Sequence, residues 1–332
     1  MKDSYSRNIN YLRISITERC NLRCVYCMPE EGVQWVPHSE VLSYEHMLRV
    51  VEAAADLGIT KVRVTGGEPT VRAGVVDFIK MLSQVTPLDD ISMTSNGIML
   101  PRLAGPLKEA GLKRVNISLD TLRPDRFRTI TRVGKLDDVM AGIRAAWDAG
   151  LSPIKLNTVV MQGFNEDEIA DIARLSVDED LHVRFIELMP FTDTHCSLGQ
   201  GKAAPAFMPY QQVMEEVERR LGKLEAAKPP VGNGPARYYR LPGARGTIGF
   251  ISPVSEDHFC THCNRLRLTA EGKLRPSLLK DSDVDLKPAL LAGASRQELS
   301  AVIGDVIRAK PQNHLLRQGQ SPNGRKMVQI GG

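Results

Sequence analysis

The chain has 332 residues, of which 42% are hydrophobic and 25% charged, a composition typical of an ordinary soluble globular protein. Its net charge of +4 is too small to indicate binding to nucleic acid or to an anionic membrane surface, and its 5% of aromatic residues are too few for base-stacking platforms. No apolar run approaches the ~18 residues that cross a bilayer, and residues 1–10 lack the apolar core of a signal peptide. We therefore expect a cytoplasmic protein without a membrane or nucleic-acid partner.

Six short runs that are rich in β-branched residues or alternate in polarity recur in the first 190 residues and predict strands. Between them lie segments with helical apolar spacing. Gly58, Gly111 and Gly150 follow three of these segments, where the end of a helix favours a left-handed residue. Alternating strands and helices build a parallel sheet, so the expected fold class is α/β, an incomplete (β/α)6 TIM-like barrel, with a doubly wound sheet as the alternative. The predicted strands span residues 12–16, 61–65, 90–94, 114–118, 154–160 and 182–188.

The composition changes after residue 189. Residues 190–209 and 226–247 are rich in Gly, Pro, Ala and small polar residues, and predict loops on either side of a helix at 210–221. Short strands, a cysteine pair and two helices at about 283–291 and 296–308 are expected to follow. We expect residues 1–189 to form the barrel and residues 190–332 to form a smaller carboxyl-terminal region packed on it.

Three of the six cysteines, Cys20, Cys24 and Cys27, lie close together directly after the first predicted strand. They therefore belong to a loop at the carboxyl end of a parallel strand, where α/β folds place their chemistry. A structural zinc site needs four protein ligands, and no fourth cysteine or nearby histidine is present. A [4Fe–4S] cluster held by three cysteines leaves one iron open for a small molecule, which suits reductive chemistry on a cofactor. The alternatives are a zinc loop or three buried thiols.

The C-x3-C-x2-C spacing, with the aromatic residue Tyr26 before the third cysteine, resembles the radical S-adenosylmethionine (SAM) superfamily. Residues 65–69 (TGGEP), which alone would predict a turn, resemble the superfamily's motif for the SAM amino group. The resemblance implies a partial (β/α)6 barrel, a cluster whose open iron chelates SAM, and reductive cleavage of SAM to methionine and a 5′-deoxyadenosyl radical. Residues 94–97, 118–120 and 189–190 follow further predicted strands and would complete a ring of polar groups on one barrel face.

A second cysteine pair, Cys260 and Cys263, is followed by Arg265 and Arg267, whose side chains would share one face of a strand. The C-x2-C spacing alone fits zinc, a cluster or a redox dithiol. Two guanidinium groups beside a metal suit an anionic, planar or phosphorylated ligand, whereas the alternative is an exposed basic edge strand. The sixth cysteine, Cys196, stands alone.

Residues 259–276, together with residues 27–33 (CMPEEGV) and the terminal Gly331 and Gly332, resemble the GTP 3′,8-cyclase family of radical SAM enzymes. The likeness runs from Arg13 to Gly332. It implies a lyase that cyclises GTP to (8S)-3′,8-cyclo-7,8-dihydro-GTP, the first step of molybdenum cofactor (molybdopterin) biosynthesis. A radical would remove the ribose 3′ hydrogen, and the carbon radical would attack guanine carbon 8. The implied partners are an electron donor such as flavodoxin, the downstream cyclic pyranopterin monophosphate synthase, and a second copy of the chain as a homodimer.

The resemblance also implies roles for individual residues. The first [4Fe–4S] cluster would be held by Cys20, Cys24 and Cys27, and a second, which binds the purine of GTP, by Cys260 and Cys263. The contacts to SAM would be Tyr26, Gly67, Ser118 and Met189. The contacts to GTP would be Arg13, Lys61, Arg63, Thr94, Lys155, Arg184, Arg265 and Arg267. Catalytic roles would fall to Arg265, Arg267 and a carboxyl-terminal tail that enters the site, Gly331 and Gly332. Basic residues within predicted strands independently favour a pocket for the ~4 negative charges of a triphosphate, although each alone fits a surface position.

The chain departs from the family pattern at one position, because Ser277 replaces the third cysteine of the second cluster. A hydroxyl is a hard, weakly acidic ligand, whereas iron–sulfur clusters favour thiolate. Three explanations stay open: a labile second cluster, a thiolate supplied by Cys196, or a divergent paralogue with altered activity on another nucleotide. Two other functions also stay open. A peptide-modifying radical SAM enzyme predicts more carboxyl-terminal cysteines, and a nucleotide-binding regulator predicts no cleavage of SAM.

Overall fold

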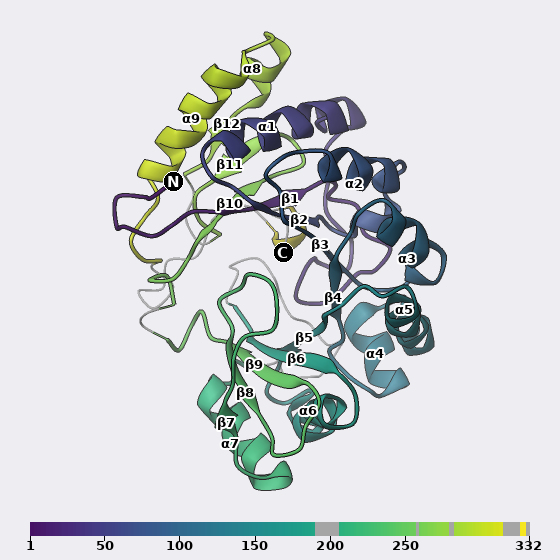
Figure 1. Ribbon diagram of the computed structural model, residues 1–332. Helices are drawn as coiled ribbons and strands as arrows, with labels where there is room; N and C mark the ends of the chain where they lie inside the picture. Colours follow the sequence, from purple (N-terminus) through teal and green to yellow (C-terminus); the bar gives the residue numbers. More distant parts are fainter. Residues whose placement is uncertain (190–205, 257–258, 279–281, 315–325, 330–332) are drawn as a thin grey trace.

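The computed structural model describes residues 1–189, 206–256, 259–278, 282–314 and 326–329 (Figure 1). One curved sheet of twelve strands runs through it in the order β12-β11-β10-β1-β2-β3-β4-β5-β6-β9-β8-β7. The strands are β1 Tyr11–Ser15, β2 Lys61–Thr65, β3 Asp90–Ser95, β4 Arg114–Ser118, β5 Ile154–Val160, β6 Leu181–Glu187, β7 Glu225–Ala226, β8 Arg237–Arg240, β9 Thr247–Ile251, β10 Arg265–Leu268, β11 Lys273–Arg275 and β12 Val284–Asp285. The α-helices are α1 Tyr44–Asp56, α2 Val75–Ser83, α3 Leu100–Glu109, α4 Pro124–Thr131, α5 Leu136–Asp148, α6 Ile169–Asp178, α7 Tyr210–Leu221, α8 Lys287–Leu291 and α9 Arg296–Arg308.

Strands β1 to β6 are parallel neighbours and form an open barrel with helices on its outer side (Figure 1). The six strands predicted from the sequence are confirmed within one residue at each end. Gly58, Gly111 and Gly150 follow α1, α3 and α5 with φ values of +89°, +109° and +69°, which confirms their expected left-handed conformation. None of the helices in the described part of the chain combines the length and apolar character that a membrane-spanning segment needs.

The strands after residue 189 continue the barrel sheet at both of its edges. Strand β9 pairs in parallel with β6, and β10 pairs in parallel with β1 on the opposite side. The carboxyl-terminal region therefore shares a sheet with the barrel rather than only packing against it, and the division at residue 189 stays a proposal. Helices α7 and α9 confirm the predicted helices at 210–221 and 296–308. The prediction of a helix over 283–291 is wrong in its first half, because α8 begins at Lys287, with Pro288 in its first turn, and β12 precedes it.

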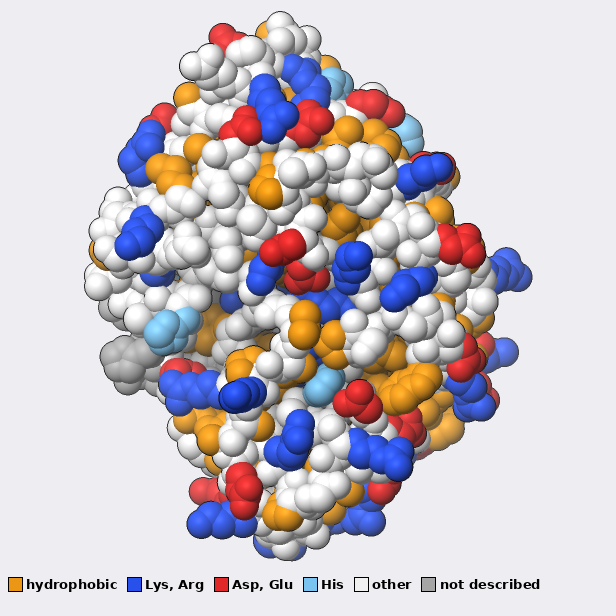
Figure 2. Space-filling model, viewed as in Figure 1, with side chains coloured by type: hydrophobic (Ala, Val, Ile, Leu, Met, Phe, Trp, Pro, Cys, Tyr) orange, Lys and Arg blue, Asp and Glu red, His pale blue; other side chains and the backbone are white. Residues whose placement is uncertain are grey.

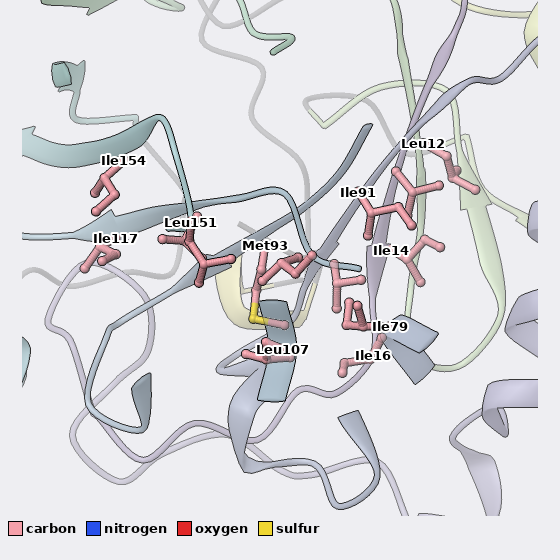
Figure 3. Close-up of a cluster of buried hydrophobic side chains, with 14 of the residues drawn as sticks. Leu12, Ile14, Ile16, Ile79, Ile91, Met93, Leu107, Ile117, Leu151 and Ile154 are labelled. Atoms are coloured by element: carbon pink, nitrogen blue, oxygen red, sulfur yellow. The ribbon is translucent and has the colours of Figure 1, made fainter. Parts of the chain in front are cut away.

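Each barrel strand buries one apolar face against the helices and turns a polar face inward. Figure 3 shows Leu12, Ile14 and Met93 in one cluster of buried apolar side chains that also includes Leu107 of α3 and Ile79 of α2. Because successive strand residues point to opposite faces, the residues between these apolar positions face the barrel interior. The alternation thus places charged side chains inside the barrel.

Candidate active site

The inward faces of β10, β1 and β2 bring three arginines side by side. Arg267, Arg13 and Arg63 are register partners across these strands, and Arg267 and Arg63 are only 5% and 4% exposed. They line one cavity together with Arg184 of β6 and Arg265 of β10. The carboxylates that line the same cavity are Asp120 and Glu187. The cavity lining in the described residues therefore carries an excess of positive charge, as a bound polyanion requires. The alternative of an exposed edge strand is wrong, since β10 lies between β11 and β1.

The lowered pKa values of two of these arginines also favour a bound anion. Burial and neighbouring guanidinium groups lower the pKa of Arg63 to about 9 and that of Arg13 to about 10, although the nearby Tyr11 opposes this effect. Buried cations of this kind are stabilised when an anion joins them. Thr94 also lines the cavity, and its buried hydroxyl oxygen has no hydrogen-bond partner among the described residues. A buried hydroxyl in that state is free to bind a ligand.

Lys61 and Lys155 lie at the amino ends of β2 and β5, and neither lines this cavity. Nζ of Lys155 donates to the carbonyl of Val231 at 2.9 Å, and Nζ of Lys61 lies 3.4 Å from Oδ1 of Asn233. Arg63 also donates to the carbonyl of Asn233, at 3.3 Å. Residues 230–233 therefore supply the acceptors for these basic side chains. On the face drawn in Figure 2, Lys and Arg side chains gather around a hollow near the centre of the molecule.

The loop after β1 presents Cys20, Cys24 and Cys27 to the same cavity. A turn forms its centre, with the main-chain N–H of Cys27 donating to the carbonyl of Cys24 at 2.9 Å. Hydrogen bonds to the end of α4 hold the loop in place, from Arg23 to Thr131 and from Val25 to Ile130. Burial raises the pKa of Cys20 to about 11 and that of Cys24 well above its usual range. A bound metal would offset that cost, because metals bind the thiolate form.

A zinc ion and an iron–sulfur cluster require different arrangements of the thiols. Among the residues that the structure describes, no three Cys, His or carboxylate side chains converge on one point, as a single zinc ion would require. A [4Fe–4S] cluster is bound through three different irons and does not need that convergence. Three cysteines of one loop that open onto a shared cavity fit this second kind of centre.

The TGGEP segment after β2 packs against the cysteine loop. Gly67 has no room for a side chain, because a Cβ atom there would lie 2.5 Å from the carbonyl oxygens of Glu18 and Arg19. The buried carboxylate of Glu68 accepts hydrogen bonds from the Ser95 hydroxyl at 2.9 Å and from the main-chain N–H of Asn96 at 2.6 Å. Glu68 therefore fixes this segment to the end of β3, a structural role that the motif alone did not indicate.

Residues expected to contact SAM also meet at the cavity. Its lining includes Tyr26, Gly67, Ser118 and Met189. The Tyr26 hydroxyl donates to Oδ2 of Asp120 at 2.6 Å, which ties the cysteine loop to the end of β4. The pairing of Tyr26 with Asp120 was not predicted, because the two residues are 94 positions apart and only the folded barrel joins them.

The second cysteine pair lies on the same cavity. Cys260, Cys263 and Ser277 all line it, and Ser277 comes from the segment that follows β11. Burial alone would raise the pKa of Cys263, but Arg265 and Lys310 outweigh it and lower that pKa to about 6. The proposed third ligand position thus shares one cavity with the pair. Cys196, the alternative source of a thiolate, lies outside the described residues.

The sequence analysis missed several residues of the lining. Phe259 and His314 line the cavity, as do Met327 and Val328 close to the carboxyl terminus. Gly331 and Gly332 lie outside the described residues, so their expected entry into the site stays a proposal. The position of Met327 and Val328, just before the two glycines, agrees with that proposal.

A parallel partial barrel that carries three clustered cysteines at the end of its first strand defines the radical SAM class. A family model described as Radical SAM superfamily matches residues 14–176, and one described as Molybdenum Cofactor Synthesis C matches residues 181–316. The crystal structure of Streptococcus suis SuiB bound to S-adenosylmethionine is similar in fold, with a TM-score of 0.61 and 13% identity over 89% of this chain and 68% of that chain.

Two relatives resemble the chain over its whole length. They are the GTP 3′,8-cyclase of Pelotomaculum thermopropionicum, 52% identical, and that of Desulforamulus reducens, 51% identical, each with 100% of both chains covered. The chain belongs to the GTP 3′,8-cyclase family.

Proposed function

We propose that the protein converts GTP to (8S)-3′,8-cyclo-7,8-dihydro-GTP, the first step of molybdenum cofactor biosynthesis. The observation that carries this proposal is the single cavity onto which both cysteine segments and five arginines open. Full-length relatives with this activity in their names support it. A divergent paralogue acting on another nucleotide is the alternative, favoured only by Ser277.

The residues at the first strand end support a site for one [4Fe–4S] cluster and SAM. Cys20, Cys24 and Cys27 would hold the cluster, which together with SAM supplies hydrogen-abstracting radical chemistry when bound. Gly67 lets the main chain approach the ligand closely, since it lacks a Cβ atom. Tyr26, Gly67, Ser118 and Met189 would line the SAM site and keep water from the reacting atoms.

The part of the cavity lined by arginines is suited to GTP. The guanidinium groups of Arg13, Arg63 and Arg184 would bind phosphate oxygens, because planar forked donors match that geometry. The Thr94 hydroxyl would gain the hydrogen bond that it lacks. Lys61 and Lys155 are proposed to join the triphosphate site, with phosphate oxygens replacing the acceptors that residues 230–233 now supply.

The second cysteine pair is proposed to hold a second [4Fe–4S] cluster that orients the purine of GTP. Cys260 and Cys263 would bind it, with Ser277 at the third position. Arg265 and Arg267 follow this pair on β10, and Arg267 is the register partner of Arg13, so their fixed positive charge would stabilise developing negative charge at the site. Gly331 and Gly332 would enter the site from the tail that begins near Met327.

Other features rest on the family resemblance and are proposed with it. These are an electron donor such as flavodoxin, the cyclic pyranopterin monophosphate synthase as the downstream enzyme, a homodimer, a cytoplasmic location, and the division of the chain at residue 189.

Anaerobic turnover with GTP, SAM and dithionite tests the proposed function. We expect mass spectrometry to detect both 5′-deoxyadenosine and the cyclised nucleotide. Cys24→Ala serves as the inactive control, and Ser277→Cys is expected to raise the yield of cyclised product. Formation of 5′-deoxyadenosine without cyclised GTP, in both the parent and Ser277→Cys, would favour the paralogue.

A further inference from the structure

Lys310 is a buried lysine that follows helix α9 and contacts the second cysteine region. It is 3% exposed, and its ammonium donates to the carbonyl of Arg265 at 2.9 Å and to the carbonyl of Pro276. The Cys263 thiol lies near enough to favour the charged form of this ammonium. One side chain thus joins the start of strand β10, two residues after Cys263, to the residue just before Ser277.

The charges around Lys310 explain why the cysteine sulfur matters to it. A buried ammonium is costly unless an opposite charge faces it. In the described part of the chain, the acidic group that faces Lys310 is Cys263, whereas the guanidinium groups of Arg7 and Arg265 oppose its charge. Arg7 is itself paired with Asp3, at 2.6 Å. Lys310 therefore places a positive charge near a sulfur that is proposed to bind the second cluster.

Two consequences follow from this position. The contacts of Lys310 fix the distance between the Cys260–Cys263 loop and the segment of Ser277, which come from different parts of the chain. Hydrogen bonds to a ligand sulfur, and a positive charge beside it, also make an iron–sulfur cluster easier to reduce. The second effect distinguishes a tuning role from simple packing.

We propose that Lys310 is a positioning residue for the second cluster: it joins the strand that follows Cys263 to the segment of Ser277, and its positive charge near the Cys263 sulfur raises the reduction potential of the cluster. This proposal rests on the proposed function, because it requires a second cluster. It assigns a role to a residue that is neither a ligand of the cluster nor part of the cavity lining.

The test uses the full-length chain carrying Cys24→Ala, so that iron binds only at the second site. Lys310→Met removes the charge at similar length, and Lys310→Arg keeps it. Lys108→Met is the matched control, because its ammonium also donates to a carbonyl, that of Gly150, but lies outside the cavity. Iron content, melting temperature and a reductive titration followed by electron paramagnetic resonance (EPR) are measured for each variant.

We expect Lys310→Met to shift the reduction of the second cluster to lower potential and to change its EPR line shape. Lys310→Arg and Lys108→Met should stay close to the parent. A Lys310→Met chain with the parent's iron content, potential and line shape would overturn the proposal. Loss of iron in both Lys310→Met and Lys310→Arg, with a lowered melting temperature, would assign a purely structural role and overturn it as well. If the parent binds no iron, even with Ser277→Cys, the proposed second cluster is refuted. This outcome distinguishes failure of the proposed function from failure of the proposed role of Lys310.

Discussion

The contact between the TGGEP segment and the cysteine loop gives a sharp prediction for Gly67→Ala. The new Cβ atom would lie 2.5 Å from two carbonyl oxygens, those of Glu18 and Arg19, whereas an ordinary van der Waals contact begins at 3.4 Å. The two segments must therefore separate by roughly 0.9 Å, the difference between these distances. They resist this movement, because main-chain N–H groups of Gly67 and Glu68 donate to Thr17 and Arg19 at 2.7 and 2.8 Å.

We expect this substitution to cost about 1–3 kcal/mol of unfolding free energy, as overpacking usually does. The same displacement moves the loop of Cys20, and a misplacement of about 1 Å at a reacting site lowers the rate by roughly 10²-fold. Thermal unfolding and the anaerobic rate of 5′-deoxyadenosine formation measure the two effects. The control is Gly304→Ala in α9, where the nearest atom to the new Cβ is a flexible Arg308 nitrogen at 3.6 Å, so stability should rise by up to about 1 kcal/mol. A Gly67→Ala chain that forms 5′-deoxyadenosine at the parent's rate would contradict this prediction.

Three further predictions address the arginines, the lysine and the threonine of the barrel interior. Arg114→Met should lower the unfolding free energy by about 3–5 kcal/mol in denaturant titrations, because it strands the carboxylate of Asp90, which Arg114 binds at 2.5 and 3.1 Å. The control is Arg296→Met, which breaks an exposed ion pair with Asp56 and should lower the unfolding free energy by less than about 1 kcal/mol. Equal losses of unfolding free energy in the two variants would contradict this prediction. Burial and the nearby Arg184 lower the pKa of Lys155 from 10.5 to about 6. The unfolding free energy should therefore fall as the pH falls from 10.5 towards 6, because the unfolded chain takes up a proton that the folded chain does not. Lys155→Met should make the unfolding free energy less dependent on pH in this range. A bound triphosphate would raise the pKa of Lys155 again, so GTP binding near pH 7.5 should take up a proton. Calorimetry would then give different binding enthalpies in Tris and in phosphate buffer. Equal enthalpies in the two buffers would contradict this proton uptake. Thr94→Val should leave the unfolding free energy of the ligand-free chain unchanged or higher, because the buried Thr94 hydroxyl has no hydrogen-bond partner among the described residues. The same substitution should weaken GTP binding. Unchanged GTP affinity would contradict the proposed contact between Thr94 and GTP.

Local sequence patterns were sufficient to predict the barrel. Alternation such as that of Leu12, Arg13 and Ile14 marks both a strand and the side chain that faces inward. The cysteine spacing is likewise a local signal, and the predicted position of Cys20, Cys24 and Cys27 at a strand end is confirmed. These features depend on neighbouring residues and need no knowledge of distant contacts.

Contacts between distant parts of the chain could not be predicted in this way. The pairing of Tyr11 with Arg265 joins β1 to β10 across most of the sequence, so no local signal indicated that β10 lies inside the sheet. Residues 230–233, which bind Lys61 and Lys155, have the composition of an ordinary loop. Lys310 follows an amphipathic helix, where the sequence predicts an exposed lysine. Its burial and its contacts are evident only in the structure.

The central claim is that radical chemistry begins at the ribose 3′ position of GTP bound in this cavity. The most direct measurement is the mass of the 5′-deoxyadenosine released when the reduced, reconstituted protein turns over GTP that carries deuterium only at carbon 3′. Deuterium should be transferred from this substrate to 5′-deoxyadenosine, whereas GTP deuterated at other ribose carbons should transfer none. Unlabelled 5′-deoxyadenosine from the 3′-deuterated substrate, formed together with a modified nucleotide, would contradict it.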